Sequence, residues 1–389
     1  MMRPPIPSPG QLSDAAANLF DKVVRGGVAD LRPTPARILH EEPQCTVFRY
    51  LRKDAAPDRA LPVLLVPPLA APALCFDLRR GHSLAEHLIA AGHPTYLVEY
   101  GAISFSDREL GLEHWVEDVI PNAIQAVRRD SGSDCQVQVV GWCLGGIMSL
   151  LSIAADDELP VSSIALIASP FDFAKVRAAA PIRRLAELTG GRLITALYQS
   201  LGGAPAPLVS LGFQLTALDK RVTKPLTLAR NLHDRDLLAH IEAVDDYMAH
   251  MLAYPGRTFG QLYHRFFRVN ELAGGCIDLD DGQHVDLSAV RVPVLVVAGD
   301  SDVLAPRDAV EAVVDLLPGA PDVRFFTAKG GHLGVLTGRS AHRTTWRYLD
   351  AFLRDYDSRR GEPDQLKAAP VPPAAWLPTG AKAKAGTTG

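Results

Sequence analysis

Two patterns of apolar residues alternate along most of the chain. Short runs of apolar residues predict strands, and longer stretches with apolar residues at helical spacing predict helices. The strand pattern covers residues 45–51, 62–66, 95–100, 137–142, 163–168, 292–298 and 323–327. The helical pattern covers residues 84–91, 112–128, 307–317 and 344–356, together with the segment after residue 143. Several strands are continuously apolar, as expected when both faces of a parallel sheet are covered. The alternation predicts an α/β fold with right-handed crossovers.

The alternation stops between residues 169 and 287. This stretch has helical patterns at 182–188, 192–201, 226–252 and 259–272, separated by segments rich in glycine and proline. We therefore expect a helical cap inserted into a core formed by residues 35–168 and 288–358. The alternative is a second helical lobe without a role in catalysis.

The two ends of the chain differ from the core. Residues 1–34 contain Ser8 and Pro9 as a helix start, then apolar residues at helical spacing until Gly26 and Gly27. This predicts an amphipathic helix and a linker, with the apolar face packed on the core or, alternatively, on a partner. Residues 359–389 are rich in alanine, proline, lysine and glycine, which predicts disorder.

Composition excludes several classes of protein. The net charge is -4 and no segment is strongly basic, which argues against nucleic-acid binding. The five cysteines are scattered without a C-x-x-C pair, which argues against a disulfide framework and a structural zinc site. The first ten residues lack the apolar region of a signal peptide, and the apolar stretch 61–74 is interrupted by prolines. We expect a soluble, cytoplasmic protein.

The segment 137–147 combines an apolar strand, the sequence Gly141-Trp142-Cys143-Leu144-Gly145-Gly146 and an apolar helix. This pattern predicts the nucleophile elbow of an α/β-hydrolase fold, with Cys143 in place of the usual serine. Glycines are needed there because a Cβ atom in the sharp turn would collide with neighbouring backbone. The helix start directs N–H groups at Cys143, which favours the thiolate. The alternative is a buried structural cysteine.

A cysteine nucleophile needs a base and an acid that orients the base, and in this fold the acid and then the histidine follow the nucleophile. Asp300 and Asp302 come after the strand 292–298, and we prefer Asp302 because it lies further into the loop. His332 follows the next strand, with Gly331 and Gly334 close on either side. The sequence thus predicts a triad of Cys143, Asp302 and His332.

An oxyanion hole requires two N–H donors. Leu144, directly after the nucleophile, is expected to supply the first. The second should come from the loop after residues 62–66, where Pro67 and Pro68 have no N–H. Leu69 and Ala70 remain as alternatives.

A cysteine nucleophile favours thioester substrates. Attack on an ester gives an intermediate that expels a thiolate, whose conjugate acid has a pKa of about 8.5, more easily than a basic alkoxide. With a thioester the two leaving groups are comparable, and the acyl-enzyme can then pass its acyl group to a hydroxyl. The chemistry favours acyl transfer and leaves hydrolysis open, since water is also an acceptor.

Several segments resemble those of the polyhydroxyalkanoate synthases and their α/β-hydrolase relatives. They include Leu65-Val66-Pro67-Pro68-Leu69, Asp77-Leu78, Gly81-His82-Ser83-Leu84, the Cys143 motif, Leu262-Tyr263, Asn270-Glu271-Leu272, Val285-Asp286-Leu287, residues 299–306 and Gly331-His332. The resemblance implies a Cys143–Asp302–His332 triad that polymerises 3-hydroxyacyl-CoA beneath a cap. Two segments depart from the family pattern, namely Ala70-Ala71-Pro72-Ala73-Leu74 and Met251-Leu252-Ala253-Tyr254-Pro255.

We therefore expect an acyltransferase that uses acyl-CoA as its substrate, without a metal or redox cofactor. The alternatives are a hydrolase of lipid esters or acyl thioesters and, from another class, a non-catalytic lipid- or granule-binding protein. Candidate partners are a second copy in a homodimer and a lipid or polymer granule surface. The acyl chain length and the acceptor are left open.

Overall fold

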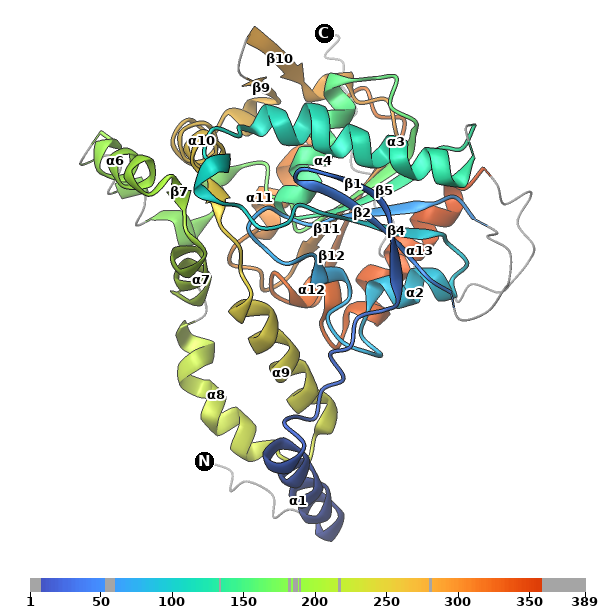
Figure 1. Cartoon of the computed structure of the whole chain (residues 1–389), viewed down its shortest axis with the longest axis vertical. Coiled ribbons are helices and arrows are strands. Elements are labelled where there is room, and N and C mark those ends of the chain that lie inside the picture. Colours follow the sequence, from blue (N-terminus) through green and yellow to red (C-terminus); the bar gives the residue numbers. More distant parts are fainter. Residues whose placement is uncertain are drawn as a thin grey trace, which may run out of the picture.

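The core of the protein is an eight-stranded sheet with the strand order β1-β2-β4-β3-β5-β6-β11-β12 (Figure 1). The computed structural model describes residues 8–52, 60–132, 134–180, 183–184, 188, 190–215, 218–279 and 282–358. The strands of the sheet are β1 (Ala36–Glu42), β2 (Cys45–Tyr50), β3 (Val63–Val66), β4 (Thr95–Glu99), β5 (Val137–Trp142), β6 (Val161–Ile167), β11 (Val294–Gly299) and β12 (Val323–Ala328).

The sheet is parallel from β4 to β12, and β1 and β2 extend it with antiparallel pairs. Strand β5 lies between β3 and β6, and every residue of these central strands except Ser162 is buried. This explains why their sequences are continuously apolar rather than alternating. The pattern did not predict β1, whose residues are exposed or half-buried at the sheet edge.

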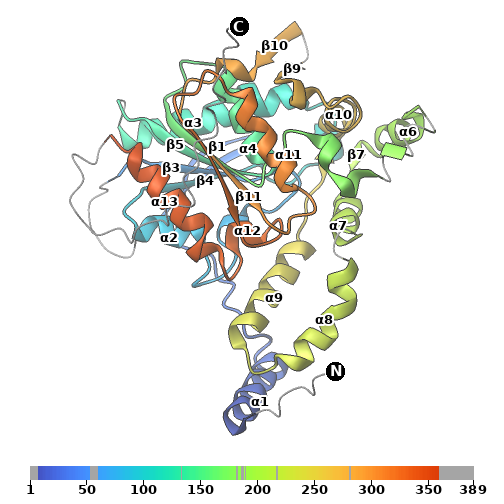
Figure 2. The ribbon, with the colours of Figure 1, turned by 180° about the vertical axis from the view of Figure 1, so that it is seen from behind.

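Helices cover both faces of the sheet, as Figures 1 and 2 show from opposite sides. One face carries α3 (Ile120–Ser131), α4 (Leu144–Ala155) and α11 (Arg307–Glu311), and the other carries α2 (Leu84–Ala90), α12 (Gly334–Thr337) and α13 (Thr345–Asp355). Helix α4, which follows the nucleophile elbow, is buried almost throughout. The sequence predicts a helix over 112–128 with a kink or a restart at Pro121. The structure has a π-helical turn at His114–Val119 and then α3, which starts anew with Pro121 in its first turn.

The region 169–287 is mostly helical. It contains α6 (Arg192–Leu201), α7 (Ala206–Leu215), α8 (Leu218–Arg230), α9 (Arg235–Ala249) and α10 (Gly256–Gln261). Two points differ from the expectation. The helix predicted over 226–252 is divided between α8 and α9, because Asp234 caps the start of a new helix. Two small strand pairs also occur, β7 (Gly203–Ala204) with β8 (Tyr254–Pro255) and β9 (Cys276–Leu279) with β10 (Gln283–Asp286).

The boundaries of the cap and the core stay a prediction. The segment 359–389, which we expect to be disordered, lies outside the described residues. Among the described residues, no helix is long and apolar enough to cross a membrane.

Helix α1 (Pro9–Val24) begins at the predicted Ser8 cap, but its orientation differs from the expected one. Its apolar side chains face solvent, with exposures of 50% for Leu19, 54% for Phe20 and 74% for Val23. Its polar side is the buried one, since Asn18 is only 4% exposed. Packing of the apolar face on the core, the outcome we expect from the sequence, is therefore wrong.

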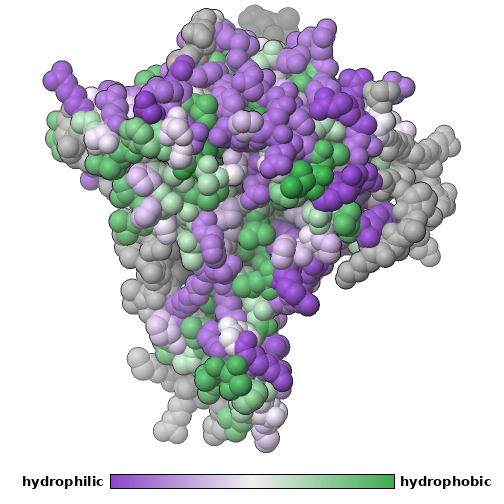
Figure 3. Space-filling model, in the orientation of Figure 1, coloured by the Kyte–Doolittle hydropathy of each residue, from purple (hydrophilic) through white to green (hydrophobic). Residues whose placement is uncertain are grey.

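Polar contacts hold α1 against α9 and the turn between α8 and α9. The Asn18 side chain donates to the Leu232 carbonyl at 2.8 Å, and Lys22 pairs with Glu242 at 2.7 Å. Arg235 at the start of α9 pairs with Asp21 at 2.6 Å. These three helices form one end of the molecule (Figure 1), and apolar surface gathers at the tip formed by α1 (Figure 3).

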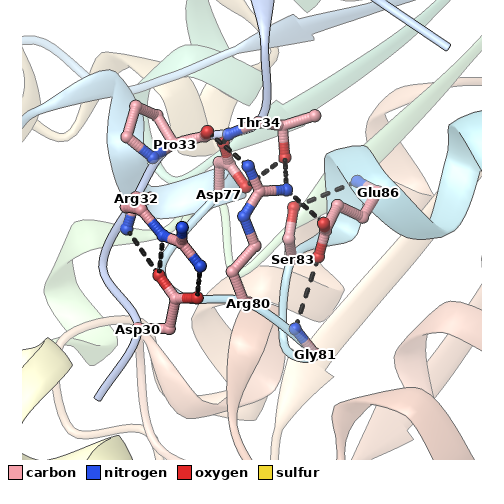
Figure 4. A network of polar contacts seen from close by, with 9 residues as sticks. All are labelled: Asp30, Arg32, Pro33, Thr34, Asp77, Arg80, Gly81, Ser83 and Glu86. Atoms are coloured by element: carbon pink, nitrogen blue, oxygen red, sulfur yellow. Dashed lines mark hydrogen bonds and ion pairs between the residues drawn. The ribbon is translucent and has the colours of Figure 1, made fainter. Parts of the chain in front are cut away.

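The chain between α1 and the sheet is tied to the segment before α2 by a polar network (Figure 4). The buried Asp77 carboxylate accepts hydrogen bonds from the Thr34 backbone N–H at 2.6 Å and from its hydroxyl at 2.9 Å. Arg80 pairs with Glu86 and also donates to the Pro33 carbonyl. Asp77, one of the residues in the family-like segments, thus has a structural partner.

Candidate active site

Cys143 lies in a sharp turn between the end of β5 and the start of α4. Its φ of 54° and ψ of -124° are rare for a residue with a side chain, and such a conformation costs about 1–3 kcal/mol. Strain of this kind persists only where the surrounding structure enforces it. The turn therefore has the form that the sequence predicts.

The glycines of the elbow are required by close backbone contacts. A Cβ atom on Gly141 would lie 2.4 Å from the Gly146 Cα, and one on Gly145 would lie 2.3 Å from the Val66 carbonyl oxygen. Real Cβ atoms essentially never approach other heavy atoms below 3.0 Å. Glycine at both positions lets α4 pack directly against β5 and the loop after β3.

His332 and Asp302 come together at the carboxyl ends of β12 and β11. The Asp302 Oδ2 atom lies 2.8 Å from Nδ1 of His332. Oδ1 of Asp302 accepts hydrogen bonds from the backbone N–H groups of Leu304 at 2.9 Å and Ala305 at 2.8 Å. The Asp302 side chain is fully buried, so these bonds fix a carboxylate that has no contact with water.

The imidazole of His332 also hydrogen bonds to the Cys143 side chain. Because Nδ1 is occupied by Asp302, Nε2 is the ring atom available to the sulfur. Trp142 packs beside the ring with 5.0 Å between centroids and donates from Nε1 to the His332 carbonyl at 3.2 Å. The ring is therefore fixed from three sides.

The charges around His332 favour its protonated form. Burial is the largest single influence and lowers the pKa of the imidazole, but the negative charges on Cys143 and Asp302, with their hydrogen bonds, outweigh it and raise the pKa. An imidazolium beside Cys143 is the arrangement that supports a thiolate nucleophile.

Asp300, the alternative acid, lies on the same loop but has another partner. Its Oδ1 accepts the backbone N–H of Gly330 at 2.9 Å. This bond ties the loop after β11 to the loop that carries His332. Of the two aspartates, Asp302 is the one in contact with the histidine.

The candidate oxyanion residues lie on two adjoining segments. Leu144 opens α4, where the first N–H groups of a helix have no partner within the helix. Leu69 and Ala70 are both buried in the loop after β3, and Ala70 has a φ of 60°, unusual for alanine. The Ala70 carbonyl accepts the Leu252 N–H at 2.9 Å. This contact joins the loop to the chain just after α9.

Two tyrosines lie near the nucleophile, Tyr247, which the sequence analysis missed, and Tyr254, which it placed in a segment that departs from the family pattern. Tyr247 belongs to α9 and Tyr254 to β8. Burial raises the pKa of both phenols, and negative charge at Cys143 raises them further. Tyr247 stands in no recognisable motif, so only its position in the fold reveals it. Among the described residues, no group of three or more His, Cys, Asp or Glu side chains is arranged to hold a metal ion.

The chain is similar to proteins of known name. The chain is 26% identical over 353 residues to the poly(3-hydroxyalkanoate) polymerase subunit PhaC of Haloarcula marismortui, covering 86% of this chain and 70% of that protein. It is 25% identical over 338 residues to the PhaC subunit of Allochromatium vinosum, covering 86% and 93%. The resemblance to polyhydroxyalkanoate synthases that the motifs predict is thereby confirmed.

A solved lipase structure in its open form superimposes with a TM-score of 0.52 and 14% identity, over 84% of this chain and 98% of that one. This likeness concerns the fold alone and, with the mostly parallel sheet, confirms the predicted α/β-hydrolase architecture. The sequence model of a family described as "Protein of unknown function (DUF3141)" matches residues 62–344. The chain belongs to this DUF3141 family.

Proposed function

We propose that the protein is an acyltransferase of the polyhydroxyalkanoate synthase type, with acyl-CoA as the acyl donor. The observation that carries the proposal is the Cys143–His332–Asp302 arrangement in a chain similar to proteins named poly(3-hydroxyalkanoate) polymerase subunits. A sulfur nucleophile beside an imidazolium is suited to exchange one thioester for another.

In the first half of the proposed reaction, the Cys143 thiolate attacks the thioester carbonyl. The oxyanion that forms is held by the Leu144 N–H and by the N–H of Leu69 or Ala70. When the intermediate collapses, the carbon–sulfur bond to CoA breaks and the departing thiolate takes the proton of His332. The products of this step are the Cys143 acyl thioester, free CoA and a neutral imidazole.

In the second half, His332 accepts the proton of an acceptor hydroxyl as its oxygen attacks the Cys143 thioester. The carbon–sulfur bond breaks and the thiolate–imidazolium pair is restored. Asp302, fixed by two backbone N–H groups, keeps Nδ1 protonated and Nε2 directed at the reacting atoms.

We also propose that residues 169–287 serve as the cap over this site. Support comes from α9 and β8, which bring Tyr247 and Tyr254 near Cys143, and from the bond between Leu252 and Ala70. The names of the relatives describe polymerase subunits, which keeps a homodimer and a granule surface among the proposed partners.

The test is to offer 3-hydroxybutyryl-CoA to the wild type and to Cys143→Ala, and to measure released CoA, free acid and polymer. Wild type should release CoA at least about 1000-fold faster than Cys143→Ala. Intact mass should show an acyl group on wild type that is lost in Cys143→Ala. Cys276→Ala, which removes a half-buried thiol on β9, is the matched control and should react like wild type.

Free acid without polymer would establish the hydrolase alternative in place of acyl transfer. Equal CoA release by wild type and Cys143→Ala would refute Cys143 as the nucleophile. A wild type that binds acyl-CoA but releases no CoA would favour the non-catalytic alternative.

A further inference from the structure

Tyr247 carries a buried hydroxyl without a protein partner. The residue is only 3% exposed, and its Oη atom has no hydrogen-bond partner among the described residues. Leaving a buried polar group unpaired costs about 1–3 kcal/mol, and most such groups in native proteins are paired. Packing alone does not explain the hydroxyl, because a phenylalanine would pack equally well.

The position of Tyr247 places this hydroxyl by the nucleophile. It belongs to the main apolar core, against which Cys143 is packed. Five residues further along the chain, the Leu252 N–H is bonded to the Ala70 carbonyl, which anchors the end of α9 to the loop after β3. Burial raises the pKa of the phenol, and negative charge at Cys143 raises it further, as expected for a group near the nucleophile.

The side chains of the loop after β3, to which the end of α9 is anchored, offer a hydroxyl little. Ala70, Ala71 and Ala73 have no polar side-chain atoms, and the Cys75 thiol is bonded to the Ala73 carbonyl. An acyl chain attached to Cys143 and running along this loop would meet apolar side chains, with the phenols of Tyr247 and Tyr254 as polar groups near the nucleophile. Sites that present such a group reject substrates that lack its partner, because the group is then left unpaired.

We propose that Tyr247 is a specificity-determining residue whose hydroxyl binds an oxygen substituent of the acyl chain close to the thioester, as in a 3-hydroxyacyl group. C3 is two bonds from the reacting carbonyl carbon, so its oxygen stays near Cys143 while the chain beyond it extends away. A phenol donates to and accepts from an alcohol, which suits a hydroxyl at this position. The inference rests on the proposed function, because it assumes that an acyl group is bound at Cys143.

The test compares 3-hydroxybutyryl-CoA with butyryl-CoA, which differs only in lacking the hydroxyl. Single-turnover CoA release is measured for wild type, Tyr247→Phe and Tyr263→Phe. Tyr263 is a matched control because its hydroxyl is also buried and has no partner among the described residues, while Arg268, rather than Cys143, is its charged neighbour. Tyr247→Phe should reduce the preference for the hydroxylated substrate by about tenfold or more, and Tyr263→Phe should keep it.

Equal slowing of both substrates by Tyr247→Phe would mean a structural role and would overturn the proposal, as would an unchanged preference. Binding of the two compounds to Cys143→Ala, with and without Tyr247→Phe, gives a readout that needs no turnover. A preference for the 3-hydroxyacyl compound that disappears in the double variant supports the assignment, and equal binding in both backgrounds refutes it. Failure of the proposed function is seen separately, as wild-type CoA release no faster than that of Cys143→Ala.

Discussion

The Asp302 carboxylate lies 2.8 Å from Nδ1 of His332 and is held there by two backbone N–H groups of its own loop. The carboxylate therefore acts on the histidine from a fixed position. It selects the tautomer with the proton on Nδ1 and stabilises the imidazolium.

Replacement of Asp302 by asparagine should lower the rate of CoA release by about 10³- to 10⁴-fold, because an amide can stabilise the wrong tautomer and carries no charge. Single-turnover kinetics with 3-hydroxybutyryl-CoA measure this loss. Asp300→Asn is the control, because its side-chain oxygen can still accept the Gly330 N–H, and it should retain most of the rate. A larger defect in Asp300→Asn than in Asp302→Asn would reverse the assignment of the two carboxylates.

The raised pKa of His332 predicts how stability depends on pH. A histidine whose folded pKa lies above its unfolded value of 6.5 binds its proton more tightly in the folded state. Its contribution is fully present below pH 6.5 and is lost as the pH rises through the folded pKa. Urea unfolding at several pH values should therefore show the wild-type advantage over His332→Gln shrinking as the pH rises. If the difference in the free energy of unfolding between wild type and His332→Gln grew toward alkaline pH, His332 would not be an imidazolium in the folded protein.

Gly145→Ala should damage both stability and chemistry. The added Cβ would meet the carbonyl oxygens of Val66 at 2.3 Å and Pro67 at 2.5 Å, and backbone cannot move aside as a flexible side chain does. We expect a loss of about 1–3 kcal/mol in the free energy of unfolding and slower acylation, since the same loop carries Leu69 and Ala70. Gly212→Ala in α7, where an added Cβ meets nothing within 4 Å, should be neutral or slightly stabilising. Equal stability of the two variants would argue against the close packing of the elbow.

Because α1 is attached through its polar side, substitutions on that side should weaken its attachment more than substitutions on its apolar side. Asn18→Ala removes a buried amide bonded to the Leu232 carbonyl and should weaken the attachment of α1 by about 1–3 kcal/mol. Phe20→Ser, on the exposed side, should change it by less than about 0.5 kcal/mol. Hydrogen exchange in α1 measures local opening and separates this effect from global unfolding. If Phe20→Ser loosened the helix more than Asn18→Ala, the apolar side would be the attached one.

The sequence predicts most of the sheet and the placement of Asp302 beside His332, because each depends on local patterns. Continuous apolar runs identify the buried strands, and the glycines around Cys143 have a steric cause that operates within a few residues. Asp302 and His332 follow from chain order in a parallel sheet, whose strands end at one edge. Their catalytic roles stay predictions until the variants are measured.

What the sequence does not predict depends on tertiary contacts. The periodicity of α1 shows which side is apolar, but it does not tell which side is covered, and here Asn18 and Asp21 are the buried residues. Tyr247 carries no motif, because it reaches the neighbourhood of Cys143 only through the path of α9. Whether Leu69 or Ala70 supplies the second N–H donor likewise depends on the orientation of the backbone, which the identity of the side chains does not predict.

The hydrogen bond between Leu252 and Ala70 has a consequence for how substrate enters. Any movement that lifts the chain after α9 away from the sheet must break this bond or displace the loop that holds Leu69 and Ala70. If the loop is displaced, the open molecule would lack the proposed site for the oxyanion, however well Cys143 and His332 remained aligned. The molecule could then not be open to admit a long chain and catalyse its transfer at the same time. The acyl-enzyme would be least reactive in the open form, in which water has the freest access.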